Sequence, residues 1–190
     1  MAELVDALVS NTSEVILVPV RPRLRVQIKS PRVMRVFYYF CKMNKKEFLS
    51  SQSEKQIILD KRYLQMAKIW AENSYCVRRK VGALIVKDKM IISDGYNGTP
   101  SGFENKCEDE NNKTYPYVLH AEANAITKVA KSNNSSLGAT LYVTTSPCVE
   151  CSKLIIQAGI SRVVFCDKYH KEDGLNLLQK AKIEVIHLPF

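Results

Sequence analysis

The spacing of hydrophobic residues predicts regular secondary structure from about residue 56 onward. Apolar residues recur at helical spacing over 56–73 with no Gly or Pro among them, which predicts a first helix. Two short runs rich in β-branched residues, 81–86 and 90–93, flank the polar residues 87–89 and predict an antiparallel hairpin. The stretch 95–116 is dense in Gly, Asn and Pro, so we expect a shaped loop there.

Helices and strands then alternate to the end of the chain. We expect helices over 120–131, 148–157 and 174–182, and strands over 139–144, 162–165 and 183–188. Strands that alternate with helices predict a parallel portion of sheet covered by helices on both faces. The predicted fold class is therefore α/β, a three-layer α/β/α sandwich with a mixed sheet of about five strands.

Residues 1–42 show neither a helical nor a strand period. They are rich in Ala, Leu and Val at first and then in Pro and Arg, and two short stretches in them resemble translated segments of a bacterial transfer-RNA gene. Two interpretations stay open: a disordered basic leader, or a segment that precedes a natural start at Met43. In both, we expect the functional domain to be 43–190.

Composition favours one globular domain. The 190 residues are 46% hydrophobic and 25% charged, which is ordinary for a folded domain of this length. Pro and Arg interrupt the one apolar run near residue 15, well short of the ~20 residues that a membrane span needs. Glu3 and Asp6 stand where a secretory signal is basic. We therefore expect a cytoplasmic protein with no membrane partner.

The basic charge indicates an anionic partner. The formal net charge is +9, of which residues 1–42 carry +4, from seven Lys or Arg against three acids. The remaining +5 suits a phosphorylated metabolite as readily as a nucleic acid, and it is modest for a nucleic-acid surface.

Two of the six cysteines, Cys148 and Cys151, form a close pair that follows Pro147. Cysteines of a cytosolic protein are more often buried hydrophobes, catalytic groups or metal ligands than cross-links. His120 lies upstream of this cysteine pair, and Glu122 follows His120 by two residues. A His-x-Glu motif followed by Pro-Cys-x-x-Cys is the signature of zinc-dependent nucleobase deaminases. The sequence therefore predicts Zn²⁺ bound by His120, Cys148 and Cys151, with a fourth position open to water.

Glu122 is the predicted catalytic residue. Zinc lowers the pKa of a bound water, which can then attack an electron-poor ring carbon near neutral pH. The ring nitrogen and the departing amine must each gain a proton, and a mobile carboxyl group beside the metal can carry both. We expect Cys166, His170 and His187 to be structural or surface residues.

Four sequence blocks between residues 59 and 188 resemble the deoxycytidylate branch of the cytidine and deoxycytidylate deaminase family. The blocks are VGA at 81–83, GYNGTPSG at 95–102, PYVLHAEANAI at 116–126, and 146–160, which begins SPC and ends IIQAGI. The resemblance implies a cytidine deaminase-like fold, a homo-oligomer, and zinc-dependent hydrolysis of dCMP to dUMP with release of ammonia. The chain would then serve pyrimidine nucleotide metabolism.

The resemblance also implies four substrate contacts. Asn97 matches an asparagine that contacts the sugar, the Ala121 amide a contact to the pyrimidine carbonyl, and Tyr169 an aromatic residue near the base. Lys131 matches a basic phosphate-binding residue. It lies eleven residues beyond His120, ~16 Å along a helix axis, so we expect it to serve a neighbouring subunit.

Two family features are less well matched. Some relatives bind a second zinc through cysteines near the positions of Cys76 and Cys107, but no His lies between residues 1 and 119 to complete such a site. Regulated members bind dCTP or dTTP near the Gly-Tyr-Asn-Gly loop, and the basic run 78–80 would suit a triphosphate.

Other functions stay open. Similar zinc chemistry serves deaminases of other cytosine nucleosides and nucleotides and of transfer-RNA adenosine, although the charge of +5 argues against a nucleic-acid substrate. A zinc-stabilised interaction protein is the non-enzymatic alternative, and it predicts that Glu122→Gln leaves function intact.

Overall fold

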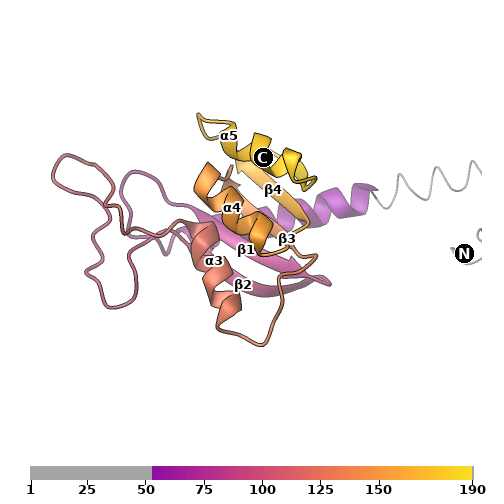
Figure 1. Ribbon diagram of the computed structural model, residues 1–190, viewed down its shortest axis with the longest axis horizontal. Helices are drawn as coiled ribbons and strands as arrows, with labels where there is room; N and C mark the ends of the chain where they lie inside the picture. The colour runs from indigo at the N-terminus through magenta and orange to yellow at the C-terminus, as the bar shows by residue number, and fades with distance from the viewer. Residues whose placement is uncertain (1–52, 190) are drawn as a thin grey trace, which may run out of the picture. The chain divides into compact units, whose positions relative to one another are not determined.

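The computed structural model describes residues 53–189, and the fold is that of the unit Gln56–Phe190. Residues 1–42, for which we expected a leader, lie outside the described residues. The elements, in chain order, are a helix over 53–71, β1 (Gly82–Lys87), β2 (Met90–Tyr96), α3 (Ala121–Ala130), β3 (Thr140–Thr145), α4 (Val149–Gln157), β4 (Arg162–Asp167), α5 (Asp173–Lys180) and β5 (Glu184–His187) (Figure 1).

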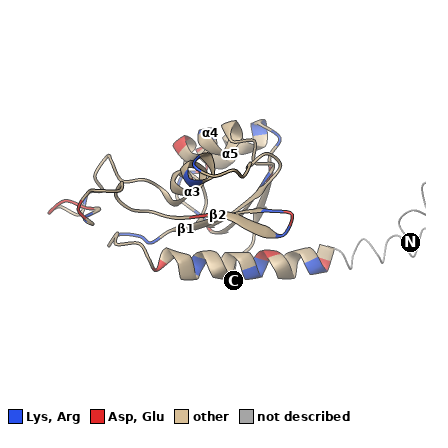
Figure 2. Ribbon diagram, turned by 90° about the horizontal axis from the view of Figure 1, so that it is seen from below, with Lys and Arg blue, Asp and Glu red and all other residues tan. Residues whose placement is uncertain are grey.

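The strands form one mixed sheet of five, in the order β2-β1-β3-β4-β5. β1 is antiparallel to β2 and to β3, whereas β3, β4 and β5 are parallel. The helix 53–71 lies on one face of the sheet and α3, α4 and α5 lie on the other (Figure 2). The prediction of a three-layer α/β/α sandwich is therefore confirmed.

Alternation along the strands explains the three layers. Odd-numbered residues such as Ile85, Val143 and Phe165 pack with α3, α4 and α5 in the larger core. Even-numbered neighbours such as Leu84 and Tyr142 pack against the helix 53–71. Because side chains of a strand point alternately to its two faces, continuous apolar runs of this kind are covered on both sides.

The predicted hairpin is confirmed, but β2 is longer than its pattern indicated. Asp88 and Lys89 both have positive φ, as the two central residues of a type I′ hairpin turn require. β2 continues through Gly95 and Tyr96, which we had placed in the loop. Gly95 pairs with Ala83, and a Cβ on Gly95 would collide with the backbone of α3. Here the glycine allows close packing of a helix and does not break the strand.

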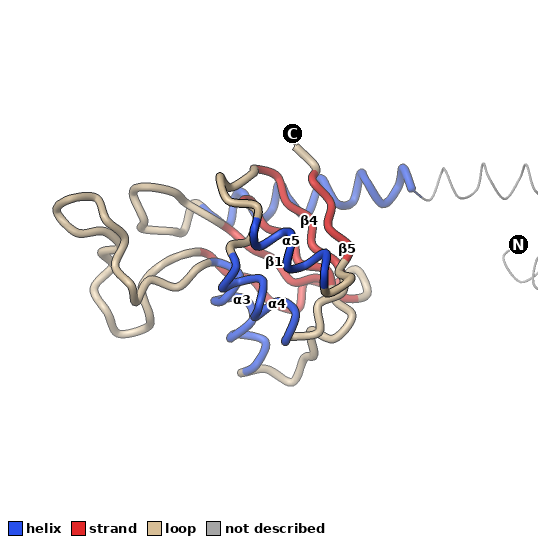
Figure 3. The backbone as a smooth tube through the Cα atoms, turned by 45° about the horizontal axis from the view of Figure 1, so that its top comes forward, coloured by secondary structure: helices blue, strands red, loops and turns tan. Residues whose placement is uncertain are grey.

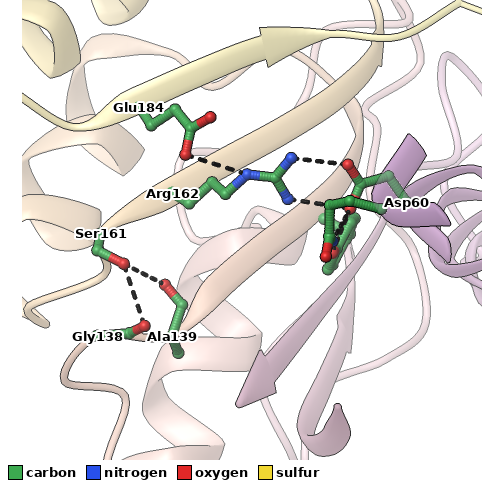
Figure 4. Close-up of polar contacts among 8 residues, drawn as sticks. Asp60, Gly138, Ala139, Ser161, Arg162 and Glu184 are labelled. Carbon is green, nitrogen blue, oxygen red and sulfur yellow. Dashed lines mark hydrogen bonds and ion pairs between the residues drawn. The ribbon is translucent and has the colours of Figure 1, made fainter. Parts of the chain in front are cut away.

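A buried ionic network fastens the helix 53–71 to the sheet (Figure 4). Asp60 is 1% exposed and accepts two hydrogen bonds from the Arg162 guanidinium, at 2.9 and 2.7 Å. Its Oδ1 also accepts one from the Tyr142 hydroxyl at 2.7 Å, and the Arg162 Nε lies 3.2 Å from a Glu184 oxygen. One carboxylate thus connects the helix to β3 and β4.

The loops 72–81 and 97–120 extend from the same end of the sheet (Figure 3). That end is where β3 and β4 finish and where α3 and α4 begin. In open α/β sheets, ligands bind at the carboxyl ends of the parallel strands. None of the helices within the described residues combines the length and the apolar composition that crossing a membrane requires.

Candidate active site

The three predicted metal ligands come together at the N-terminal ends of two helices. His120 is the N-cap of α3, Cys148 is the N-cap of α4, and Cys151 lies in the first turn of α4. Their ligand atoms all lie within 4.8 Å of one another. The His120 Nδ1 is 3.5 Å from the Cys148 sulfur and 3.3 Å from the Cys151 sulfur. His120 therefore forms one cluster with two cysteines that lie 28 and 31 positions further along the chain.

Protons are shared unequally within this cluster. A hydrogen bond with Cys151, reinforced by His120, lowers the pKa of Cys148 to about 3. The hydrogen bond with Cys148, together with burial, raises the pKa of Cys151 above its usual range. The hydrogen bond with Cys148 also raises the pKa of His120. Metal binding would replace these protons, because zinc binds thiolate and neutral imidazole.

The donor set fits zinc. Two sulfurs and one imidazole nitrogen are the ligands that zinc prefers, and three protein donors are one fewer than a structural zinc site uses. Solvent exposure decreases across the cluster: His120 is exposed, Cys148 is partly buried and Cys151 is buried. Three protein donors would hold zinc and leave one coordination position for water.

Glu122 lies beside the cluster as predicted. It belongs to the first turn of α3, is 4% exposed, and lines the same cavity as His120 and Cys148. Burial raises the pKa of its carboxyl group, which also contacts the Cys151 thiol. A carboxyl group beside the metal ligands is placed to accept and to donate protons in turn.

The cluster opens into a cavity of about 320 Å³, a size that suits a small organic ligand. Polar and apolar side chains from five separate segments line it. Its lining residues are Cys76, Arg78, Arg79, Val81, Asn97, Glu108, Thr114, Val118, His120, Ala121, Glu122, Thr145, Ser146, Cys148, Tyr169 and His170.

Three of the four predicted substrate contacts line this cavity. They are Asn97, Ala121 and Tyr169. The Asn97 side chain accepts a hydrogen bond from Val81 N and donates one to Arg79 O, both at 2.8 Å, so it also fixes the neighbouring backbone.

The fourth predicted contact, Lys131, is exposed and caps the far end of α3. It does not line the cavity of its own chain. Its predicted service to a neighbouring subunit stays a prediction.

Sequence reasoning missed several lining residues. Arg78 and Arg79 were visible as a basic run, but we assigned that run to a regulatory triphosphate. His170 had been expected on the surface or in the core, and it also lines the cavity. Glu108 and Thr114 come from the loop 97–120, where no periodicity indicates which side chains point inward.

Cys76 and Cys107 are joined as a disulfide. The two cysteines are 31 residues apart, and no local pattern in the sequence indicates that they pair. The sequence instead favours metal binding or hydrophobic packing for the cysteines of this chain. The bond connects the segment before Arg78 to the loop 97–120. It therefore ties two walls of the cavity together.

Comparison with known proteins agrees with this geometry. The model of the family "Cytidine and deoxycytidylate deaminase zinc-binding region" matches residues 58–167. Deoxycytidylate deaminase of enterobacteria phage T4 is 34% identical over 66% of this chain and 88% of its own length. The human deoxycytidylate deaminase is 41% identical over 58% of this chain and 66% of its own length.

A solved structure is also similar. It is the dCMP deaminase of cyanophage S-TIM5, in complex with dCMP and dUMP. It superposes with a TM-score of 0.66 and 46% identity, over 67% of this chain and 94% of the phage chain.

Proposed function

Because this chain belongs to the cytidine and deoxycytidylate deaminase family, we propose that it hydrolyses dCMP to dUMP and ammonia. One observation carries the proposal: a cluster of three candidate zinc ligands opens into a cavity through His120 and Cys148, and a buried carboxyl group and two arginines line the same cavity. The first two features supply deamination chemistry, and the arginines supply a reason for a phosphorylated substrate.

Zinc bound by His120, Cys148 and Cys151 would lower the pKa of a bound water, which would provide a nucleophile near neutral pH. Glu122 takes the proton that the attacking water loses and delivers it to the ring nitrogen N3. The same carboxylate then takes the remaining proton from the new hydroxyl at C4 and passes it to the amine, so that the C4 carbonyl forms as the C–N bond breaks and ammonia leaves. Its burial in the first turn of α3 holds it beside the reacting ring.

The pyrimidine and sugar are oriented by residues from three elements. The Ala121 amide, at the first position of α3, is one of the N–H groups that a helix leaves unpaired, and it donates to the pyrimidine carbonyl. Tyr169 packs near the base. The Arg79 guanidinium lies 5.9 Å from the centre of the Tyr169 ring. Asn97 retains a second amide hydrogen for the sugar hydroxyl.

Arg78 and Arg79 bind the 5′-phosphate. Both are exposed and both line the cavity. Guanidinium groups match phosphate geometry and form charge-assisted hydrogen bonds. A phosphate at this position explains selection of a nucleotide over a nucleoside.

Assembly and regulation complete the proposal. A homo-oligomer would bring Lys131 of one chain to the phosphate of another, and exposed apolar residues of the helix 53–71, such as Ile58 and Ile69, offer a surface for assembly. Regulation by dCTP or dTTP belongs to the proposal as well, because the Gly-Tyr-Asn-Gly loop, near which regulated members of the family bind these nucleotides, borders the cavity at Asn97. Because its substrate is an intracellular metabolite, we place the enzyme in the cytoplasm.

The test is ammonia release from dCMP, CMP, deoxycytidine and cytidine by the zinc-loaded protein. We expect dCMP to have the highest kcat/KM. Arg78→Ala should lower kcat/KM for dCMP about tenfold or more and leave deoxycytidine unchanged, because only the phosphate contact is lost. Lys153→Ala on α4 is the charge-matched control, since Lys153 pairs with the exposed Glu150. Turnover of cytidine without turnover of dCMP would overturn the substrate assignment.

A further inference from the structure

Glu108 is a buried carboxylate at the wall of the cavity, only 7% exposed. One of its oxygens accepts a hydrogen bond from Val77 N at 3.2 Å, and the other accepts one from Arg78 N at 3.3 Å. A buried carboxylate is stable only when its charge is met by such partners. Glu108 therefore holds the backbone of the segment that carries Arg78.

The side chain of Arg78 is held by the same loop. Its Nη1 donates a hydrogen bond to the Thr114 hydroxyl at 3.2 Å. Thr114 and Glu108 face each other through an antiparallel bridge. The turn between them is fixed by Asp109, whose Oδ1 accepts hydrogen bonds from two backbone N–H groups. The backbone and the guanidinium of Arg78 thus rest on one short hairpin, 108–114.

This hairpin is itself fastened to the segment it holds, because Cys107 is bonded to Cys76. The Glu108 carboxylate is directed at backbone N–H groups and not at the guanidinium. Within residues 53–189 no carboxylate forms a salt bridge with Arg78. The arrangement places a positive charge at the cavity and leaves it available to an anion.

We propose that Glu108 is a positioning residue for phosphate recognition, which acts through Arg78 to select nucleotides over nucleosides. The proposal rests on the proposed function and names a determinant of its substrate class. It makes the hairpin 108–114 a specificity element that never touches the reacting ring.

Glu108→Gln is the variant that tests it. Glutamine has one carbonyl oxygen where glutamate has two carboxylate oxygens, so it can serve fully only one of the two N–H groups and carries no charge. We expect KM for dCMP to rise about tenfold with kcat little changed. Deoxycytidine has no phosphate, so its kcat/KM should stay the same. Glu110→Gln, an exposed carboxylate of the same hairpin, is the matched control and should resemble the parent.

A double-mutant cycle decides whether Glu108 acts through Arg78. In an Arg78→Ala background, Glu108→Gln should cause no further loss on dCMP. Thr114→Val removes only the hydroxyl that Arg78 contacts, so it provides a second variant should Glu108→Gln fold poorly. We expect it to raise KM for dCMP about two- to threefold, which is typical of the loss of one weak hydrogen bond. Equal losses on dCMP and deoxycytidine, or a full loss in the Arg78→Ala background, would overturn the proposal.

Binding provides a readout that is independent of turnover. The dissociation constants of dUMP and deoxyuridine, measured by calorimetry on the zinc-loaded protein, should differ less in Glu108→Gln than in the parent. A parent protein that deaminates neither dCMP nor deoxycytidine would contradict the proposed function. A parent that deaminates dCMP, with variants that keep the same preference for it, would contradict only the role of Glu108.

Discussion

Replacing Asp60 by Asn should destabilise the fold strongly without touching the cavity. The Asp60 carboxylate is 1% exposed, and its partner Arg162 has a side chain that is 14% exposed. Removing one charge of a buried pair costs about 3–5 kcal/mol, because the other charge is left uncompensated. Glu184 still lies 3.2 Å from Arg162 and offsets part of this cost, so we expect a loss of about 3 kcal/mol.

Thermal unfolding of the zinc-saturated protein, followed by circular dichroism, measures this loss. For a domain of this size a loss of about 3 kcal/mol lowers the Tm by roughly 10 °C. Glu150→Gln is the control, because its ion pair with Lys153 is exposed and should contribute less than about 1 kcal/mol. Replacing the pair together, as Asp60→Leu with Arg162→Met, should recover part of the stability, because no charge is left buried but the Tyr142 hydroxyl still loses its acceptor. A Tm for Asp60→Asn within about 2 °C of the parent would refute the reasoning.

Three further predictions concern pH, packing and metal. Burial tends to raise the pKa of Asp60, but hydrogen bonds from Arg162, Tyr142 and Gln56 outweigh it and lower the pKa below the ordinary 3.8. The resulting stability is complete above that value and is lost as pH falls through the folded pKa, so acid titrations of unfolding free energy should be shallower for Asp60→Asn. Gly95→Ala should lower the Tm and the activity, because a Cβ there collides with the α3 backbone, whereas Gly98→Ala has room and should do neither. Removing zinc with a chelator should lower the Tm. Adding zinc back at about a thousand times its Kd should raise the free energy of unfolding, measured by calorimetry, by about 4 kcal/mol.

The layers of the fold follow from sequence because its periods are clear. Every predicted helix and strand from residue 56 onward is present. The three layers follow because strands with continuous apolar runs need a helical layer on each face. The error at Gly95 has a physical cause: a glycine that breaks a strand and one that admits a helix look alike in sequence. The Asp60–Arg162 pair is 102 residues apart, so no local pattern could reveal it.

The metal cluster was predictable in a way that the rest of the cavity was not. His120, Cys148 and Cys151 stand at helix starts, and their chemical types and spacing restrict them to a shared ion. Glu108 and Thr114 lie in a loop whose shape depends on long-range contacts. Their residue types occur on many protein surfaces, so only the folded chain distinguishes them.

The central claim is that a zinc ion held by three residues and a carboxyl group beside it deaminate dCMP. The most direct test measures zinc content and ammonia release from dCMP on the same sample of Glu122→Gln. We expect about one zinc per chain, because Glu122 is not a ligand, and a fall in kcat of at least about 100-fold, because the proton carrier is lost. A variant that keeps its zinc and the parent's kcat would contradict the claim.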